Sequence, residues 1–303
     1  MSKLLIDLYD FDSINDYLAL NIKSFIINLQ EFSTEKTLNV FLEQVEIIND
    51  LDDEIELFIN LDRLYYNDDF NSLSSILKKL NKLKIRKLII NDAGVVELIK
   101  ELGLKFELIN GSNTLNTNYQ TIEFLSNYYR GFYLSNEINL NEILKIRDNT
   151  NAMLMVQVFG KQLMFSSKRK LLTSYFQFHH LDLIDFNSQN PLIIKDLNDI
   201  NNKSYIYEDS NGTYVTTYKN VNALDYLYDF IVNDIDYLYL SNLFIDRNSY
   251  LRVVNIFSSL LEQTINLDMA KSMFKDVNLE VSSSFLNDET VFNLEDIKKM
   301  EGI

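Results

Sequence analysis

The sequence predicts an α/β protein of the (β/α)8 TIM-type barrel class, with an insertion after strand seven and a short C-terminal extension. Short runs rich in Ile, Leu, Val and Phe alternate with segments whose apolar residues recur at helical spacing. Eight such pairs follow one another, and strands separated by helices must be parallel. No glycine-rich turn follows the first run, which disfavours the alternative, an open doubly wound sheet that binds a nucleotide.

Each expected strand is a compact, mostly apolar run that ends at a polar residue or a glycine. These runs are residues 3–10, 22–29, 54–61, 85–92, 105–110, 131–136, 152–159 and 235–242. Apolar residues spaced three and four apart predict the helices between them, as at Leu38, Phe41, Leu42 and Val45. The expected helices are 13–19, 34–49 (with Ser33 as N-cap), 70–83, 94–102, 119–129, 140–148, 221–233 and 249–264.

Two further segments do not fit the alternation. The polar stretch from Asp182 to Asn222 reads as a loop-like insertion, and the residues after Thr264 read as a helix followed by a polar end. We therefore expect a barrel over 1–264 that includes an insertion at 161–220, and a C-terminal extension over 265–303. With one proline and seven glycines in 303 residues, no Pro/Gly-rich linker divides the chain.

Composition excludes several classes of protein. The chain has no cysteine, so it can form neither a disulfide nor a thiolate-ligated metal or iron–sulfur site of its own. The two histidines, His179 and His180, are neighbours and diverge in regular structure, so we expect no metal site. The start MSKLLIDLYDF lacks the apolar stretch of a signal peptide, and no run of about 18 apolar residues occurs. We expect a cytoplasmic protein without a membrane segment.

Polar residues at the strand ends are the candidate site residues, because barrel enzymes carry their chemistry where strands pass into the following loops. Asn and Asp dominate this set, and they are also common as turn and helix N-cap residues. Asp92 and Glu137 are the candidate catalytic acids, and Asn60 and Asn110 are candidate ligand contacts. The full set is Asp10, Asn60, Asp62, Asn91, Asp92, Asn110, Asn113, Asn136, Glu137, Gly160, Ser241 and Asn242.

One segment differs in charge from the rest of the chain. The protein has a formal charge of -16, yet no Asp or Glu occurs from Asn149 to Leu181. Within that span Lys161, Lys168, Arg169 and Lys170 follow the seventh strand, with aromatic residues just beyond them. Cations at the mouth of a barrel predict an anion site for phosphate or carboxylate groups. The alternative is a solvated helix start whose charges pair with nearby acids.

Several stretches, taken in order, resemble the U32 peptidase (collagenase-like protease) family. They are "FINLDRLYYNDD", "LIINDAGVVELI", "NTLNTNYQTIEFL", "YLSNEINLNEI", "VQVFGKQLMFSSKRKLLTSYF", the hairpin "YIYEDSNGTYVTT" and "DYLYLSNLFIDRNSYLRVVNIF". The resemblance covers nearly the whole chain and is greatest to the shorter of two paired proteins of low-GC Gram-positive bacteria. It implies a part in prephenate-dependent hydroxylation of the tRNA wobble uridine, whereas other branches hydroxylate ubiquinone or cleave collagen-like substrates.

Departures from the family pattern affect the expected chemistry. Phe159-Gly160 stands where the family has His-Gly, and Leu163 and Lys170 stand where cluster-bearing relatives have cysteine. Tyr239-Leu240-Ser241-Asn242 replaces a Lys-Ile-acid-Gly sequence. The resemblance therefore implies a subunit without a cofactor of its own, which works with a cysteine-containing U32 paralogue and, through that complex, with tRNA and a prephenate-like ligand. The alternatives are a stand-alone peptidase or hydrolase and a non-catalytic ligand-binding barrel.

Overall fold

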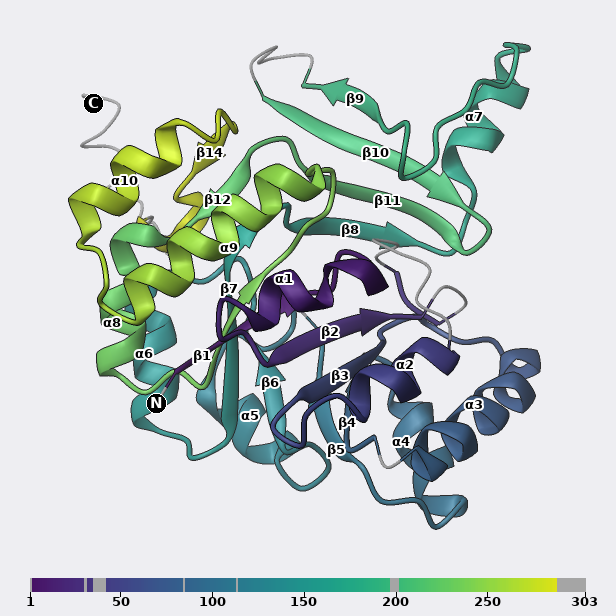
Figure 1. Cartoon of the computed structure of the whole chain (residues 1–303). Helices are drawn as coiled ribbons and strands as arrows, with labels where there is room; N and C mark the ends of the chain where they lie inside the picture. Colours follow the sequence, from purple (N-terminus) through teal and green to yellow (C-terminus); the bar gives the residue numbers. More distant parts are fainter. Residues whose placement is uncertain are drawn as a thin grey trace, which may run out of the picture.

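The computed structural model describes residues 2–29, 32–34, 42–83, 85–112, 114–196 and 202–287. Eight parallel strands pair in chain order, and the last pairs with both the first and the seventh, so they close a barrel (Figure 1). The (β/α)8 prediction is confirmed. The barrel strands are β1 (Lys3–Asp7), β2 (Ser24–Asn28), β3 (Glu56–Leu61), β4 (Lys87–Ile90), β5 (Glu107–Asn110), β6 (Gly131–Tyr133), β7 (Met153–Gly160) and β13 (Tyr237–Leu240).

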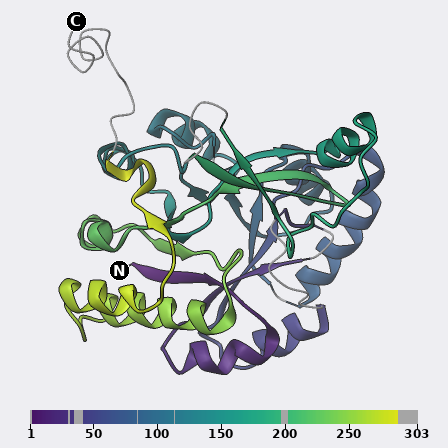
Figure 2. The same ribbon diagram turned by 90° about the horizontal axis from the view of Figure 1, so that it is seen from above.

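Helices follow the barrel strands and surround them, as the view from above shows (Figure 2). Residues 35–41 of the helix expected at 34–49 lie outside the described residues, and the Ser33 hydroxyl donates to the carbonyl of Asn60. The helix expected at 221–233 is shorter, because its first residues form a strand. The helices are α1 (Ile14–Leu18), α2 (Leu42–Asn49), α3 (Phe70–Lys82), α4 (Ala93–Glu101), α5 (Tyr119–Leu125), α6 (Leu140–Asp148), α8 (Leu227–Val232) and α9 (Arg247–Leu261), with short 3-10 turns η1 (Phe11–Ser13), η2 (Asn67–Asp69) and η3 (Leu224–Tyr226).

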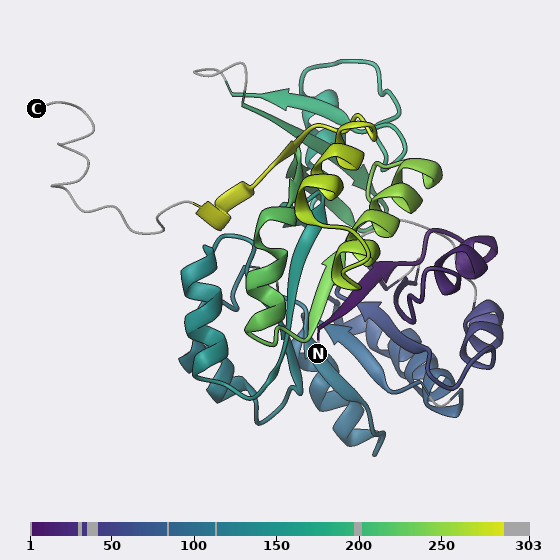
Figure 3. The same cartoon turned by 60° about the vertical axis from the view of Figure 1, so that its left-hand side comes forward.

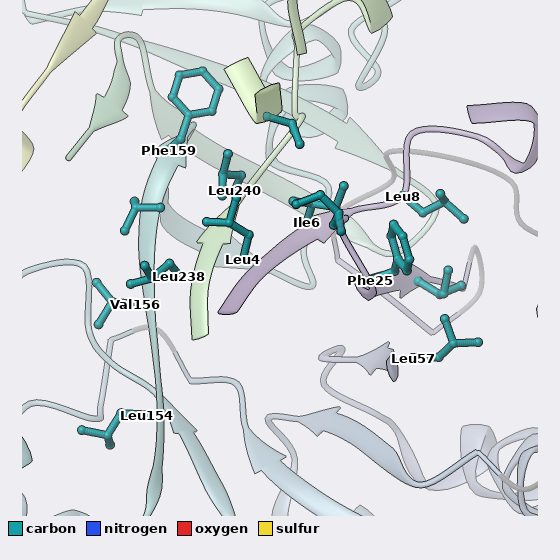
Figure 4. Packing of buried hydrophobic residues seen from close by; sticks show 14 of the residues in the cluster. Leu4, Ile6, Leu8, Phe25, Leu57, Leu154, Val156, Phe159, Leu238 and Leu240 are labelled. Atoms are coloured by element: carbon teal, nitrogen blue, oxygen red, sulfur yellow. The ribbon is translucent and has the colours of Figure 1, made fainter. Parts of the chain in front are cut away.

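Alternation along the strands divides the core into two sets of side chains. Leu4 and Ile6 on β1, with Leu238 and Leu240 on β13, belong to the large cluster between strands and helices (Figure 4). The alternate residues fill the barrel interior, and these are Leu5, Ile26, Phe58, Ile89, Ile109, Met155, Tyr237 and Tyr239. Both faces of each strand are therefore buried, which explains the near-continuous apolar runs in the sequence.

The insertion is a folded unit, so the loop-like description of Asp182–Asn222 is wrong. Four antiparallel strands form a second sheet in the order β8-β11-β10-β9, and α7 projects beside it (Figure 1). The hairpin expected in "YIYEDSNGTYVTT" is confirmed as β10 and β11, paired from Asp209↔Gly212 to Ser204↔Thr217. The elements are β8 (Leu163–Ser167), α7 (Leu171–Phe178), β9 (Leu192–Lys195), β10 (Lys203–Asp209) and β11 (Gly212–Thr217).

The chain returns from the insertion to the barrel next to where it left. Strand β12 (Asn220–Asn222) runs antiparallel to the end of β7, with Val221 opposite Gly160. Beyond α9, α10 (Leu267–Lys275) packs on α9, and β14 (Val281–Ser282) pairs with β12 (Figure 3). A short turn, η4 (Ser284–Asn287), follows. The division of the chain at residue 264 stays a prediction.

Candidate functional site

A buried carboxylate, Asp7, lies at the carboxyl end of β1, where the parallel strands all end. Its Oδ2 accepts hydrogen bonds from the Tyr239 hydroxyl at 3.0 Å and from the Asn242 amide at 3.1 Å. Its Oδ1 accepts from Asn28 Nδ2 at 3.4 Å. Burial raises the pKa of Asp7 to about 6, although these donors act in the opposite direction. Asp7 can therefore hold or release a proton near neutral pH.

Amide side chains continue this network across the barrel mouth. Asn60 Nδ2 donates to Asn28 Oδ1 at 2.7 Å, which links β3 to β2. Among the buried amide atoms that have no hydrogen-bond partner within the described residues, three lie at the ends of β3, β4 and β13, and these are Asn60 Oδ1, Asn91 Oδ1 and Asn242 Nδ2. Because an unpaired buried polar atom is costly, such atoms indicate a place where a ligand or water makes the missing bond.

Asp62 lies beside Asn60 and is half-buried. It accepts from the Thr34 amide at 2.6 Å and from the Thr34 hydroxyl. Burial raises the pKa of Asp62, against the effect of the Thr34 donors. The mouth thus contains a buried acid, Asp7, and a half-buried one, Asp62, of which only Asp62 was among the sequence candidates.

A cleft of about 370 Å³ opens above this network, between the barrel mouth and strand β8 of the insertion. A cavity of about 40 Å³, lined by Asn60, Asp62, Asn91, Tyr133 and Tyr239, lies below it at the barrel centre. A larger hollow of about 810 Å³ lies near the opposite end, around Glu107 and Arg130. The mouth is the better candidate, since the opposite end of such barrels contributes stability and the mouth carries the chemistry.

Lys168 is the member of the basic segment that lines the cleft. Its ammonium lies 3.3 Å from the centre of the Tyr66 ring, donates to the Leu64 carbonyl at 2.8 Å and pairs with Asp69 at 3.6 Å. Burial lowers the pKa of Lys168, although Asp69 opposes this. These contacts join the insertion to the loop between β3 and α3.

The structure places the other three basic residues in different surroundings, with Lys161 buried and Arg169 and Lys170 exposed. Lys161 is buried, donates to the Tyr218 carbonyl and lies over the rings of Tyr205 and Tyr218. Its burial lowers the pKa of Lys161 to about 8. Arg169 and Lys170 are exposed at the start of α7, and neither makes an ion pair with any residue that the structure describes.

The remaining candidates follow the strand ends, and several have structural partners. Asp92 is the N-cap of α4, with Oδ1 accepting from the Gly94 amide at 2.8 Å and Oδ2 accepting from the Tyr65 amide at 3.1 Å. Glu137 is exposed after β6, and no hydrogen bond joins these two described acids. Asn110 Oδ1 accepts from the Ser112 amide and from Asn116 Nδ2, so it shapes the loop after β5.

Four further candidates are Asp10, Asn136, Ser241 and Asn113. Asp10 caps η1 through the Ser13 amide, and Asn136 keeps a buried Nδ2 without a partner among the described residues. Ser241 lies beside Gly160, and Asn113 falls outside the described residues. Asp7 was missed, although it is the one acid in β1. On a strand buried on both faces, an acid within the apolar run signals a buried polar site.

These features define a (β/α)8 barrel with a polar mouth under a β-sheet insertion. The sequence profile of peptidase family U32 matches residues 28–296, and the chain belongs to this family. It is similar to the tRNA hydroxylation protein P2 of Bacillus subtilis (strain 168), with 23% identity over 251 residues, or 78% of this chain and 81% of that protein. It is also similar to an uncharacterized protease of Methanocaldococcus jannaschii, with 28% identity over 123 residues, 41% of this chain and 29% of that protein.

Solved structures with a related arrangement are more distant. A U32 peptidase covers 61% of this chain and 80% of its own at 15% identity, with a TM-score of 0.43. The phosphoribosyl anthranilate isomerase of Thermus thermophilus covers 87% of this chain and all (100%) of its own at 8% identity, with a TM-score of 0.48. A likeness at this level does not indicate a shared activity.

Two features are absent from the part of the chain that the structure describes. No group of three or more His, Asp or Glu side chains in this part of the chain is arranged to hold a metal ion. None of its helices combines the length and the apolar character needed to cross a membrane.

Proposed function

We propose that this chain takes part in tRNA hydroxylation, as a subunit that has no iron–sulfur cluster of its own. The similarity to tRNA hydroxylation protein P2 over most of both chains carries this proposal. The absence of cysteine in all 303 residues supports the division of labour, because a thiolate-bound cluster needs another chain. The partner we propose is a cysteine-containing U32 paralogue.

The barrel mouth offers groups suited to this role. Asp7, held by Tyr239 and Asn242, titrates near pH 6 and can move a proton at its Oδ2. The unpaired amide atoms of Asn60 and Asn91 can orient a polar ligand that enters through the cleft. We propose that the reaction is prephenate-dependent 5-hydroxylation of the wobble uridine, with Arg169 and Lys170 toward the tRNA phosphates or ligand carboxylates.

The experiment is mass analysis of tRNA nucleosides from a strain that lacks the gene. We expect 5-hydroxyuridine derivatives to fall and to return when the wild-type gene is restored. Restoration with Asn60→Leu should fail, whereas restoration with Asp53→Asn, an exposed change before β3, should succeed. Unchanged hydroxyuridine derivatives in the deletion strain would overturn the proposal.

A second experiment addresses the cofactor and the partner. Elemental analysis of the purified, untagged chain should find no stoichiometric iron or other transition metal. Copurification of this chain with its cysteine-containing paralogue should give iron in the complex. Iron bound to this chain alone would contradict the proposed division of labour.

A further inference from the structure

The outer face of the insertion sheet carries a row of apolar side chains across all four strands. The register places Phe165 of β8 opposite Val215 of β11, Val215 opposite Ile206 of β10, and Ile206 opposite Leu192 of β9. Directly opposed residues point to the same face of a sheet. Phe165 is 48% exposed and the other three are partly exposed, so the row faces solvent in the described structure.

Strand β9 and helix α7 are also unusually apolar on their surface. Ile193 and Ile194 on β9 are 48% and 41% exposed, and Tyr175 and Phe178 on α7 are 55% and 78% exposed. Ten of the 23 large apolar side chains that are exposed among the described residues lie within 161–220. A concentration of this kind on one segment marks an interaction surface.

Strand β9 also offers backbone groups for pairing. It is the last strand of the sheet, and no strand of the described residues pairs with its outer edge. An exposed edge strand with apolar side chains is a template for a strand from another chain. Figure 1 shows β9 at the margin of the molecule, away from the barrel.

Charge indicates what occupies this surface. The insertion 161–220 has seven Lys and Arg against six Asp and Glu, whereas the other residues have 21 against 38. Two copies of the chain would therefore repel one another through their acidic barrels. Contact through the two insertions keeps this repulsion small, because the insertions lack the excess of acid.

We infer that the insertion pairs with the insertion of a second copy of this chain, through β9 and the apolar row. A two-fold axis uses the same patch on both copies. Antiparallel pairing centred on Ile193 would place Leu192 of one copy opposite Ile194 of the other, on the same face. The apolar row then continues from one sheet into the next. This pairing is independent of the role in tRNA hydroxylation.

The test is the molar mass of the purified full-length chain, by light scattering after size exclusion, over about a hundredfold range of concentration. The expected particle contains two 35.6 kDa chains. Ile194→Asp should weaken the dimer at least about tenfold, because it places an unpaired charge in the contact. The matched control is Ile47→Asp on α2, where the isoleucine is 50% exposed and the change in charge is the same.

Thermal unfolding of each variant checks that the fold is retained, and Ile194→Lys separates the loss of the apolar group from the added negative charge. A single-chain mass at every concentration would overturn the inference, as would a dimer that Ile194→Asp and Ile194→Lys leave intact. A chain that is monomeric alone, but forms a complex with another U32 protein that Ile194→Asp abolishes, also overturns self-pairing. That outcome would assign the same surface to the other protein.

Discussion

Asp7→Asn tests whether a buried, titrating carboxylate lies under the barrel mouth. Burial raises the pKa of Asp7 from 3.8 to about 6, so the ionised form is disfavoured in the folded chain. The stability that the protonated group contributes is complete below pH 3.8 and is lost as pH rises through 6. Since one pKa unit corresponds to about 1.4 kcal/mol, the loss amounts to about 3 kcal/mol of unfolding free energy.

The amide of Asn cannot ionise, so the variant escapes this loss. The unfolding free energy of Asp7→Asn minus that of the wild type should rise by about 3 kcal/mol from pH ~3 to pH ~7 and then level off. Urea unfolding at several pH values measures it, and any fixed cost of the amide cancels from the trend. Asp53→Asn controls for the loss of one negative charge at an exposed position. A difference that is constant with pH, or that falls as pH rises, would refute the reasoning.

Three further predictions concern other parts of the chain. Burial opposes ionisation of Glu56, but the Lys87 ammonium at 2.9 Å lowers the pKa of Glu56 to about 2. Glu56→Gln should therefore lower the unfolding free energy by about 2 kcal/mol at pH 7, and this loss should shrink as pH falls from 4.5 towards 2. A loss that stays constant with pH in urea titrations would contradict this. Gly160→Ala should lower the melting temperature more than Gly103→Ala. A Cβ at Gly160 would lie 2.5 Å from the Ser241 carbonyl oxygen, whereas a Cβ at Gly103 would have nothing within 4 Å. Equal shifts in melting temperature would argue against the contact. Arg169→Ala and Lys168→Ala should each weaken tRNA or carboxylate-ligand affinity in the assembled complex, with the tRNA salt slope falling by about one per lost phosphate contact, and unchanged affinity with lower thermal stability would make the segment structural.

The barrel could be predicted because its strands are buried on both faces. Runs such as LLI at 4–6 and LII at 88–90 are apolar without interruption, so they stand out from the helical segments between them. The insertion could not be predicted as a sheet from its apolar pattern. Ser204, Tyr205 and Ile206 on β10 are all partly exposed, and a sheet with neither face fully buried lacks a clear alternation.

The candidate site was predicted in position but not in its key residues. The strand ends do converge on one mouth, and Asn60 and Asp62 lie there as expected. Asp7 was not predicted, because its partner Tyr239 is 232 residues away and only closure of the barrel joins them. The different surroundings of Lys161 and Lys168 were not predicted for the same reason, because they depend on distant parts of the chain. Tyr205 and Tyr218 bury Lys161, and the loop after β3 binds Lys168.

The two ends of the insertion lie side by side where β12 runs antiparallel to the end of β7, with Val221 opposite Gly160 and Asn222 opposite Phe159. The sixty residues of the insertion thus begin and end at the same place on the barrel. The eight barrel strands pair into a closed sheet without them. Such a segment can be exchanged, lengthened or replaced by a short turn during evolution at little cost to the barrel, since loop closure depends only weakly on length. Members of this family could therefore acquire new partners by changing this appendage while the barrel below it remained intact.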